Sequence, residues 1–142
     1  DLDLVVMLMG TLPKTVRGQA RTEKSEYPDF SQGELTFDNG TATLTASRLE
    51  DDFSRTMDIV YPSGEVHIDF NAKTLTHNTP FDLNAAFGED PSAKDSLGAA
   101  SNAFIQAVLD DSPVPVTAED GYNALKLALA IDGDLKWEKD ES

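Results

Sequence analysis

The hydrophobic and polar positions change their period along the chain, from helical spacing to strand alternation and back. Residues 1–10 place apolar side chains three and four positions apart, namely Leu2, Val5, Val6 and Met9, which is typical of a helix. Gly10 favours the end of this helix. From residue 15 to residue 77, short runs of alternating apolar and polar residues are separated by turn residues. This stretch predicts a series of strands.

The clearest local signal lies in residues 34–49, ELTFDNGTATLTASRL. Alternation places Leu35 and Phe37 on one face of the first run and a row of hydroxyl side chains on the polar face of the pair: Thr36, Thr41, Thr43, Thr45 and Ser47. The dipeptide Asn39-Gly40 between the runs predicts a hairpin with a two-residue type I′ turn.

Two later segments return to helical spacing. Residues 95–111 carry one apolar stripe, formed by Leu97, Ala100, Phe104, Ala107 and Val108. Residues 117–135 begin with Thr117 three positions before Asp120, a pair typical of a capping box. The main apolar stripe of this segment contains Tyr122, Leu125, Ala128 and Leu129, and Ala124, Leu127 and Ile131 widen it.

Consecutive strands joined by short turns favour antiparallel pairing, and an apolar sheet face needs a cover. The pattern therefore predicts an α+β fold, in which helices pack on one face of an open, predominantly antiparallel sheet of about five or six strands.

Composition restricts the partners of this domain. The 142 residues contain 26 acidic and 11 basic side chains, a net charge of −15, so nucleic acids and anionic membrane surfaces are not expected partners. The absence of cysteine excludes a disulfide framework, a thiolate zinc site and a cysteine nucleophile, and it fits a cytoplasmic protein. The longest apolar run, residues 4–9, is too short to cross a bilayer.

Motifs that hold nucleotide cofactors or catalytic nucleophiles are absent from the sequence. It contains no G-x-G-x-x-G, no P-loop, no G-x-S-x-G and no H-E-x-x-H. We therefore assign no catalytic, cofactor-binding or metal-binding residue within these 142 positions.

The two histidines test the possibility of a metal site. If residues 71–72 form a two-residue turn, His67 pairs with Thr76 and His77 pairs with Val66, so the histidines point to opposite faces and share no metal ion. His67 lies in a polar row with Glu65 and Asp69. This row either faces solvent, binds a partner or performs acid–base chemistry.

Two arginines are the candidates for ligand contacts. Arg48 and Arg55 flank an acidic segment, and a guanidinium group suits a phosphate or a carboxylate. The alternative is that both arginines pair with the acidic residues between them, Glu50, Asp51 and Asp52.

Three segments resemble the Gfo/Idh/MocA oxidoreductases, the family of glucose–fructose oxidoreductase and inositol dehydrogenase. Residues 33–70, from GELTFDNG to GEVHIDF, are similar to the central stretch of the family. Residues 95–111, DSLGAASNAFIQAVLDD, resemble a family helix that often reads D-P-L-x-x-E-x-x-x-F-I-x-A-V, with Ser96 in place of Pro and Ala100 in place of Glu. Residues 113–131, PVPVTAEDGYNALKLALAI, resemble its C-terminal helix.

The resemblance implies that residues 1–142 are one C-terminal domain, which binds substrate and builds oligomers through its open sheet. The partner domain, a Rossmann domain that binds NAD or NADP, would lie outside this chain. The family acts on sugars, cyclitols or nucleotide sugars, and these segments look closest to dehydrogenases of UDP-amino sugars. Its catalytic Lys and its D-x-x-x-H motif have no counterpart here. Residues 1–4, DLDL, match the positions directly after that His in the family, so we expect the isolated chain to be inactive and to bind no cofactor.

Two functions remain open at the level of sequence. The first is the domain of an NAD(P)-dependent dehydrogenase just described. The second is a non-catalytic dimerisation or adaptor module with the same fold, since fold alone does not fix function. In that case the hydroxyl-rich sheet face would meet a second sheet across a two-fold axis, or face water.

Overall fold

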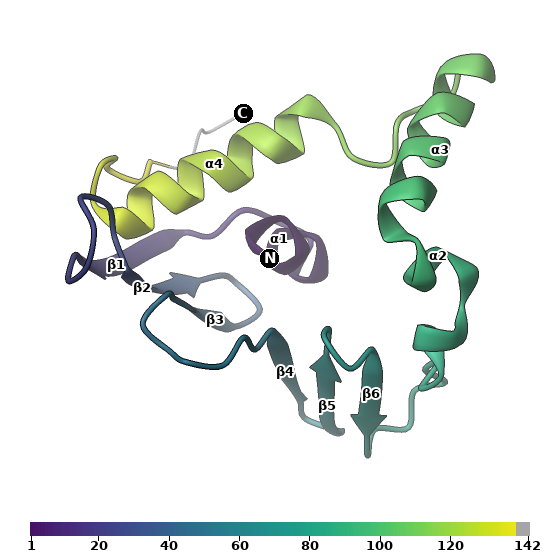
Figure 1. Ribbon diagram of the computed structural model, residues 1–142, viewed down its shortest axis with the longest axis horizontal. Coiled ribbons are helices and arrows are strands. Elements are labelled where there is room, and N and C mark those ends of the chain that lie inside the picture. The colour runs from purple at the N-terminus through teal and green to yellow at the C-terminus, as the bar shows by residue number, and fades with distance from the viewer. Residues whose placement is uncertain (139–142) are drawn as a thin grey trace. The chain divides into compact units, whose positions relative to one another are not determined.

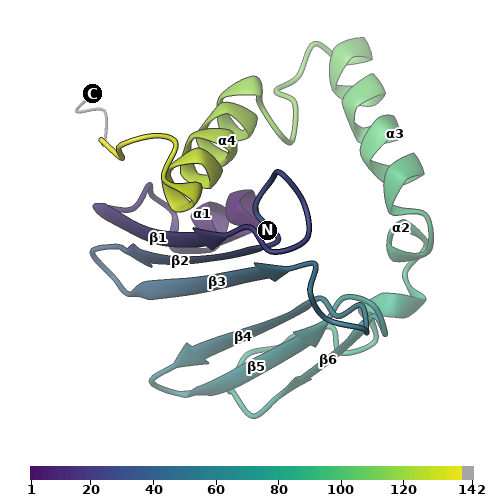
Figure 2. The same ribbon diagram turned by 60° about the vertical axis from the view of Figure 1, so that its left-hand side comes forward.

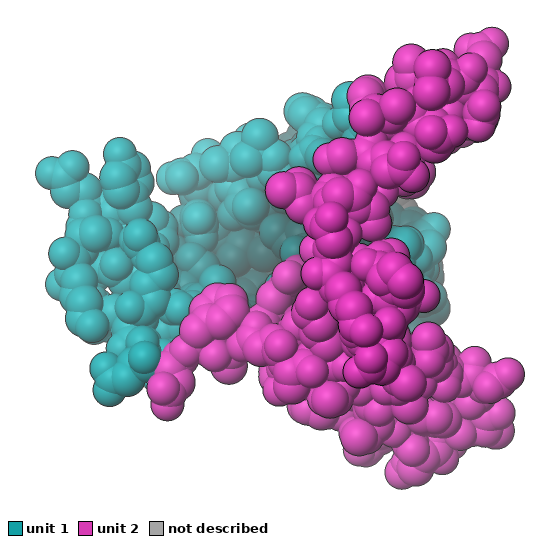
Figure 3. Space-filling view, turned by 45° about the vertical axis from the view of Figure 1, so that its right-hand side comes forward, with its two compact units in different colours: residues 1–51, 116–142 teal, residues 52–115 magenta. Residues whose placement is uncertain are grey.

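A computed structural model describes residues 1–138, and these divide into two compact units (Figure 3). Unit 1 is built from residues 1–51 and from the chain after residue 115, and unit 2 is residues 52–115. No helix within residues 1–138 is both long and apolar enough to span a membrane.

Unit 1 consists of a three-stranded sheet and two helices that lie on one side of it (Figure 2). Its elements are α1 (Leu2–Met9), β1 (Thr15–Arg21), β2 (Phe30–Thr36), β3 (Thr41–Ser47) and α4 (Ala118–Asp132) (Figure 1). The strands follow each other as an antiparallel meander, and α4 contacts β1, β2 and α1. The core between sheet and helices contains Val5, Leu35, Phe37, Leu127 and Ile131.

The predicted β2–β3 hairpin is confirmed, but its turn lies one residue earlier than expected. The last strand pair is Thr36 with Thr41, and the amide of Phe37 donates to the carbonyl of Gly40 at 2.8 Å. Asp38 and Asn39 are therefore the central residues. Neither Asn39 nor Gly40 has a positive φ, so the predicted type I′ turn at Asn39-Gly40 is wrong. The pairing of β2 with β3 is therefore shifted by two positions from the predicted one. An even shift keeps every side chain on its predicted face of the sheet.

Unit 2 contains the second three-stranded antiparallel sheet and three helical segments. Its elements are β4 (Thr56–Tyr61), β5 (Gly64–Asp69), β6 (Thr74–His77), the 3₁₀ helix η1 (Phe87–Glu89), α2 (Pro91–Lys94) and α3 (Ser96–Leu109). β5 lies between β4 and β6. The predicted register is confirmed, because Val66 pairs with His77 and His67 pairs with Thr76.

The predicted fold class is confirmed, with one refinement. The protein is α+β and both sheets are antiparallel, but the six strands form two sheets of three and not one sheet of five or six. The break falls between β3 and β4. Residues 48–55 join them as an irregular segment that contains three consecutive acidic residues.

The helix ends follow the sequence signals, whereas the buried sides of α3 and α4 do not. Thr117 and Asp120 form the predicted capping box at the start of α4, and Gly10 ends α1 with φ 71°. In α4 the buried residues are Leu127 and Ile131, while the predicted main stripe is largely exposed: Tyr122, Leu125 and Leu129. In α3 only Ala107 of the predicted stripe is buried.

Candidate functional site

The end of the unit 1 sheet carries an ordered loop, residues 22–29, which is built around one carboxylate. The Asp29 side chain is buried and accepts hydrogen bonds from the backbone amides of Glu23, Lys24 and Ser25 at 2.9, 2.7 and 3.1 Å. The Ser25 hydroxyl donates to the other carboxylate oxygen at 3.1 Å. The amides of Lys24 and Glu23 are the main reason that the pKa of Asp29 lies far below its usual value of 3.8, because these bonds favour the charged form.

Arg48 fastens this loop to the end of β3. Its Nη2 atom donates to the Ser25 hydroxyl at 3.1 Å, to the Pro28 carbonyl at 3.0 Å and to the Asp29 carboxylate at 3.2 Å. The carboxylate partner of Arg48 is therefore Asp29, and not one of the acidic residues at positions 50–52 that the sequence suggested as the alternative. Nη1 and Nε take no part in these three bonds, and 60% of the side chain is exposed.

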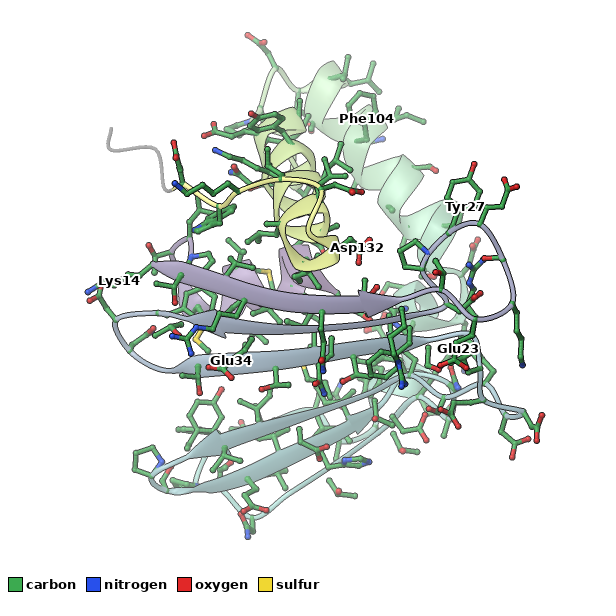
Figure 4. All side chains as sticks on the ribbon, turned by 90° about the vertical axis from the view of Figure 1, so that its left-hand side faces the viewer. Lys14, Glu23, Tyr27, Glu34, Phe104 and Asp132 are labelled. Atoms are coloured by element: carbon green, nitrogen blue, oxygen red, sulfur yellow. The ribbon has the colours of Figure 1, made fainter. Side chains whose placement is uncertain are left out.

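The Arg48 side chain is oriented in a way that suits the binding of an anion. Three acceptors hold the guanidinium through a single nitrogen, and most of the side chain is exposed, so an anion would meet a cation that is already oriented. Figure 4 shows Glu23 and Tyr27 in the 22–29 loop, and the Tyr27 ring is exposed. Arg21, at the end of β1, stacks over the Phe30 ring at 4.3 Å. The site can orient an anionic or planar group, and its Asp29 carboxylate is engaged by three backbone amides.

Asp29 gives the loop a pH dependence whose sign follows from its pKa. Because folding lowers this pKa, the stabilisation by the ionised carboxylate is complete above pH 3.8 and declines as the pH falls below that value. We expect Asp29→Asn to lower the urea midpoint of unit 1 at pH 7. The difference in urea midpoint between this variant and the wild type should be smaller at pH 3. Fluorescence of the single tryptophan, Trp137, measures this midpoint. Asp134→Asn, at an exposed position of the same unit, is the control. An equal difference in urea midpoint at both pH values would show that the charge of Asp29 does not stabilise the loop.

Arg55 belongs to unit 2, and its contacts differ from those of Arg48. Its guanidinium lies over the Phe70 ring at 4.9 Å, and its carbonyl accepts a hydrogen bond from the Phe70 amide at 2.9 Å. The two arginines that the sequence proposed as ligand contacts are thus placed in different units, each with partners of its own.

The open face of the unit 1 sheet is polar across all three strands. Strand register aligns its side chains in rows, namely Thr15–Thr36–Thr41, Arg17–Glu34–Thr43 and Gln19–Gln32–Thr45. Gln19 donates to Gln32 at 2.9 Å, and Gln32 donates to Thr45 at 3.3 Å. Figure 4 shows Glu34 on this face and Asp132 on the helix side. A shallow hollow of about 200 Å³ lies between Arg17, Gln19, Gln32 and Glu34.

The histidines occupy the two faces that the sequence predicted, and one of them has a partner that the sequence did not identify. Nδ1 of His67 lies 2.6 Å from a carboxylate oxygen of Asp58, its pairing partner on the neighbouring strand β4. The sequence is sufficient to predict this pair. The two-residue turn Pro62-Ser63 pairs Tyr61 with Gly64, and this register places Asp58 opposite His67. His77 contacts the Thr79 hydroxyl at 3.0 Å. Within residues 1–138, no three His, Asp or Glu side chains are grouped closely enough to hold a metal ion.

Comparison with known proteins connects this fold to an enzyme class. The chain is 29% identical over 139 residues to the UDP-N-acetylglucosamine 3-dehydrogenase of Acidithiobacillus ferrooxidans. The match covers 92% of this chain and 44% of that enzyme, its C-terminal part. A solved structure of the same enzyme superposes with a TM-score of 0.81 at 28% sequence identity, over 96% of this chain and 44% of that one.

The predicted resemblance to Gfo/Idh/MocA oxidoreductases is confirmed. A proposed oxidoreductase from Yersinia pestis shares the fold of this chain, with a TM-score of 0.67 over 99% of the chain and 48% of that structure, at 14% identity. No protein-family model matches the sequence. The domain therefore spans a little under half the length of the relatives that it matches.

Proposed function

We propose that this chain is the substrate-binding and oligomerisation domain of an NAD(P)-dependent dehydrogenase that oxidises a hydroxyl of a nucleotide sugar. The observation that supports it is the similarity to UDP-N-acetylglucosamine 3-dehydrogenase, which extends over 92% of the chain. A related sugar or cyclitol is the next substrate class to test. A cytoplasmic location stays a prediction from composition.

The chemistry of alcohol oxidation separates the roles of the two parts of such an enzyme. The reaction needs a base for the hydroxyl proton and a nicotinamide cofactor that accepts the hydride. The residues of this chain do not fit that cofactor, because no glycine-rich loop follows a strand and opens a helix. NAD or NADP would be held by the other part of the enzyme, and these 142 residues would bind and orient the sugar nucleotide.

The gene provides a direct test of this division. Codons upstream of this stretch should encode G-x-G-x-x-G, an E-K-P motif and a D-x-x-x-H motif. If they encode none of these, the dehydrogenase proposal fails and the adaptor module is the better description.

Arg48 is our first candidate for a substrate contact, and Arg55 is the second. At Arg48 the support is geometric, since one nitrogen is held by the 22–29 loop while 60% of the side chain is exposed. A diphosphate offers the oxygen pairs that such an edge binds well. At Arg55 the support is the residue type and its place next to the acidic segment.

Replacing Arg48 in the intact enzyme separates binding from folding. We expect Arg48→Ala to raise the KM for the UDP-sugar at least about tenfold, the loss of one charge-assisted contact, with kcat changed little. Arg48→Lys should recover part of the affinity. Asp29→Asn is the comparison variant, because it loosens the same loop and removes one of the three acceptors of Arg48 but keeps the guanidinium, so its KM should rise less. If Asp29→Asn raises KM equally, or if Arg48→Ala abolishes folding, Arg48 acts only on the loop.

We also propose that two copies meet through the polar face of the unit 1 sheet. Its aligned threonine and glutamine rows present hydrogen-bonding groups on every strand. Sedimentation of the chain should show a dimer that Thr43→Arg weakens. A strict monomer at high concentration would contradict this interface.

A further inference from the structure

Helix α3 presents its large apolar side chains to solvent and turns its small ones inward. Ala107 is buried, and Ala99 and Ala103 are half-buried. In contrast, Leu97, Phe104 and Val108 are 79%, 57% and 62% exposed. Figure 4 shows Phe104 on this helix.

The exposed residues form one continuous face. At about 100° per residue, positions 97, 104 and 108 fall within about 20° of one line along the helix, and positions 105 and 109 lie about 80° and 120° around the helix from it, on the same side. We call these residues the α3 face: Leu97, Phe104, Ile105, Val108 and Leu109, each more than half exposed. Ala99, Ala103 and Ala107 lie on the other side of the helix. Single exposed apolar residues are ordinary, whereas a contiguous group of five marks an interaction surface.

The charges around the α3 face indicate the chemistry of its partner. Within unit 2, residues 95–115 contain no Lys or Arg but three acidic side chains: Asp95, Asp110 and Asp111. Asp95 caps the start of α3, and Asp110 and Asp111 follow its end. The partner therefore needs an apolar surface with Lys or Arg at its edge.

A second copy of the same face does not meet this requirement. If two α3 helices paired in antiparallel fashion, Asp95 of one would meet Asp110 and Asp111 of the other. If they paired in parallel, like residues would meet. Both arrangements oppose carboxylates only.

We propose that the α3 face docks on the nucleotide-binding part of the same enzyme, on an apolar patch edged by basic side chains. This inference rests on the proposed function. The chain spans 44% of the length of its dehydrogenase relative, so more than half of such an enzyme is available as the partner. The docked helix would connect the substrate-binding part to the cofactor-binding part of one polypeptide.

Single cysteines test this docking, since the chain contains none. Phe104→Cys and Val108→Cys report on the α3 face, and Val60→Cys on β4, 74% exposed, is the control. Each variant is labelled with a thiol reagent in the 142-residue chain and in the intact enzyme, and peptide mass spectrometry follows the labelled position. We expect labelling at 104 and 108 to be at least about tenfold slower in the intact enzyme, at every protein concentration, and labelling at 60 to be unchanged.

Three results would overturn the proposal. Equal rates at position 104 in both forms would mean that nothing covers the α3 face. Protection that disappears on dilution would identify a second copy as the partner. Slow labelling already in the 142-residue chain would mean that this chain covers the face itself. Hydride transfer measured on the same preparation keeps the two proposals apart, because an inactive protein in which position 104 is still protected contradicts the dehydrogenase and not the docking.

Discussion

Gly18→Ala is expected to unfold unit 1. Gly18 lies in the middle of β1, and a Cβ atom there would overlap the backbone carbonyl and Cα of Ile131, near the end of α4. Backbone atoms cannot rotate away, so the helix would have to leave the sheet. We expect a loss of at least about 3 kcal/mol in the free energy of unfolding, at or above the upper end of ordinary overpacking. Urea unfolding followed by Trp137 fluorescence measures it, because Trp137 donates to the Pro13 carbonyl within the same unit.

Two other glycines serve as graded controls for Gly18→Ala. A Cβ at Gly33 would lie 2.6 Å from the Cδ1 atom of Ile131, the flexible end of a side chain, so Gly33→Ala should cost less. A Cβ at Gly121 in α4 would meet nothing within 4 Å, so Gly121→Ala should be neutral or stabilise by up to about 1 kcal/mol. If all three variants unfold at the same urea concentration, α4 does not pack on β1 as described.

Leu127→Ala is expected to destabilise unit 1 by about 2–5 kcal/mol, the usual cost of truncating a fully buried leucine. Leu127 is 0% exposed, whereas Leu125, two positions earlier on the same helix, is 58% exposed. In the isolated chain Leu125→Ala should therefore change stability by less than about 0.5 kcal/mol. The pair tests which side of α4 faces the sheet, and the same urea titration applies. A larger loss of stability with Leu125→Ala than with Leu127→Ala would mean that the side of α4 that carries Leu125 faces the sheet.

The apolar period of α4 predicts its helical structure but not its buried side. Apolar residues cover most of its circumference, so the sequence pattern allows several orientations. The sheet selects one of them, because Gly18 and Gly33 are paired in register and leave room for Ile131. Two glycines on neighbouring strands are a recognisable sign of such a close approach, so this part of the packing could have been predicted once the register was known.

The contacts of Arg48 depend on the fold over a longer range. The sequence predicts this residue as a candidate because it is an arginine beside an acidic segment, and local pairing with that segment is the simpler alternative. Its observed carboxylate partner, Asp29, is 19 residues away and becomes a neighbour only when β2 and β3 pair. Asp58, the partner of His67, is different, since a two-residue turn fixes its position and the sequence alone is sufficient to find it.

We propose that this chain is one part of a dehydrogenase and that the chemistry requires the rest of the enzyme. The most direct measurement is the absorbance of reduced nicotinamide when UDP-N-acetylglucosamine and NAD or NADP are added to the intact enzyme and, separately, to the 142-residue chain. We predict reduction of the cofactor by the intact enzyme and none by the chain alone. Turnover by the isolated chain, or an intact protein that reduces neither cofactor with any UDP-sugar, would contradict it.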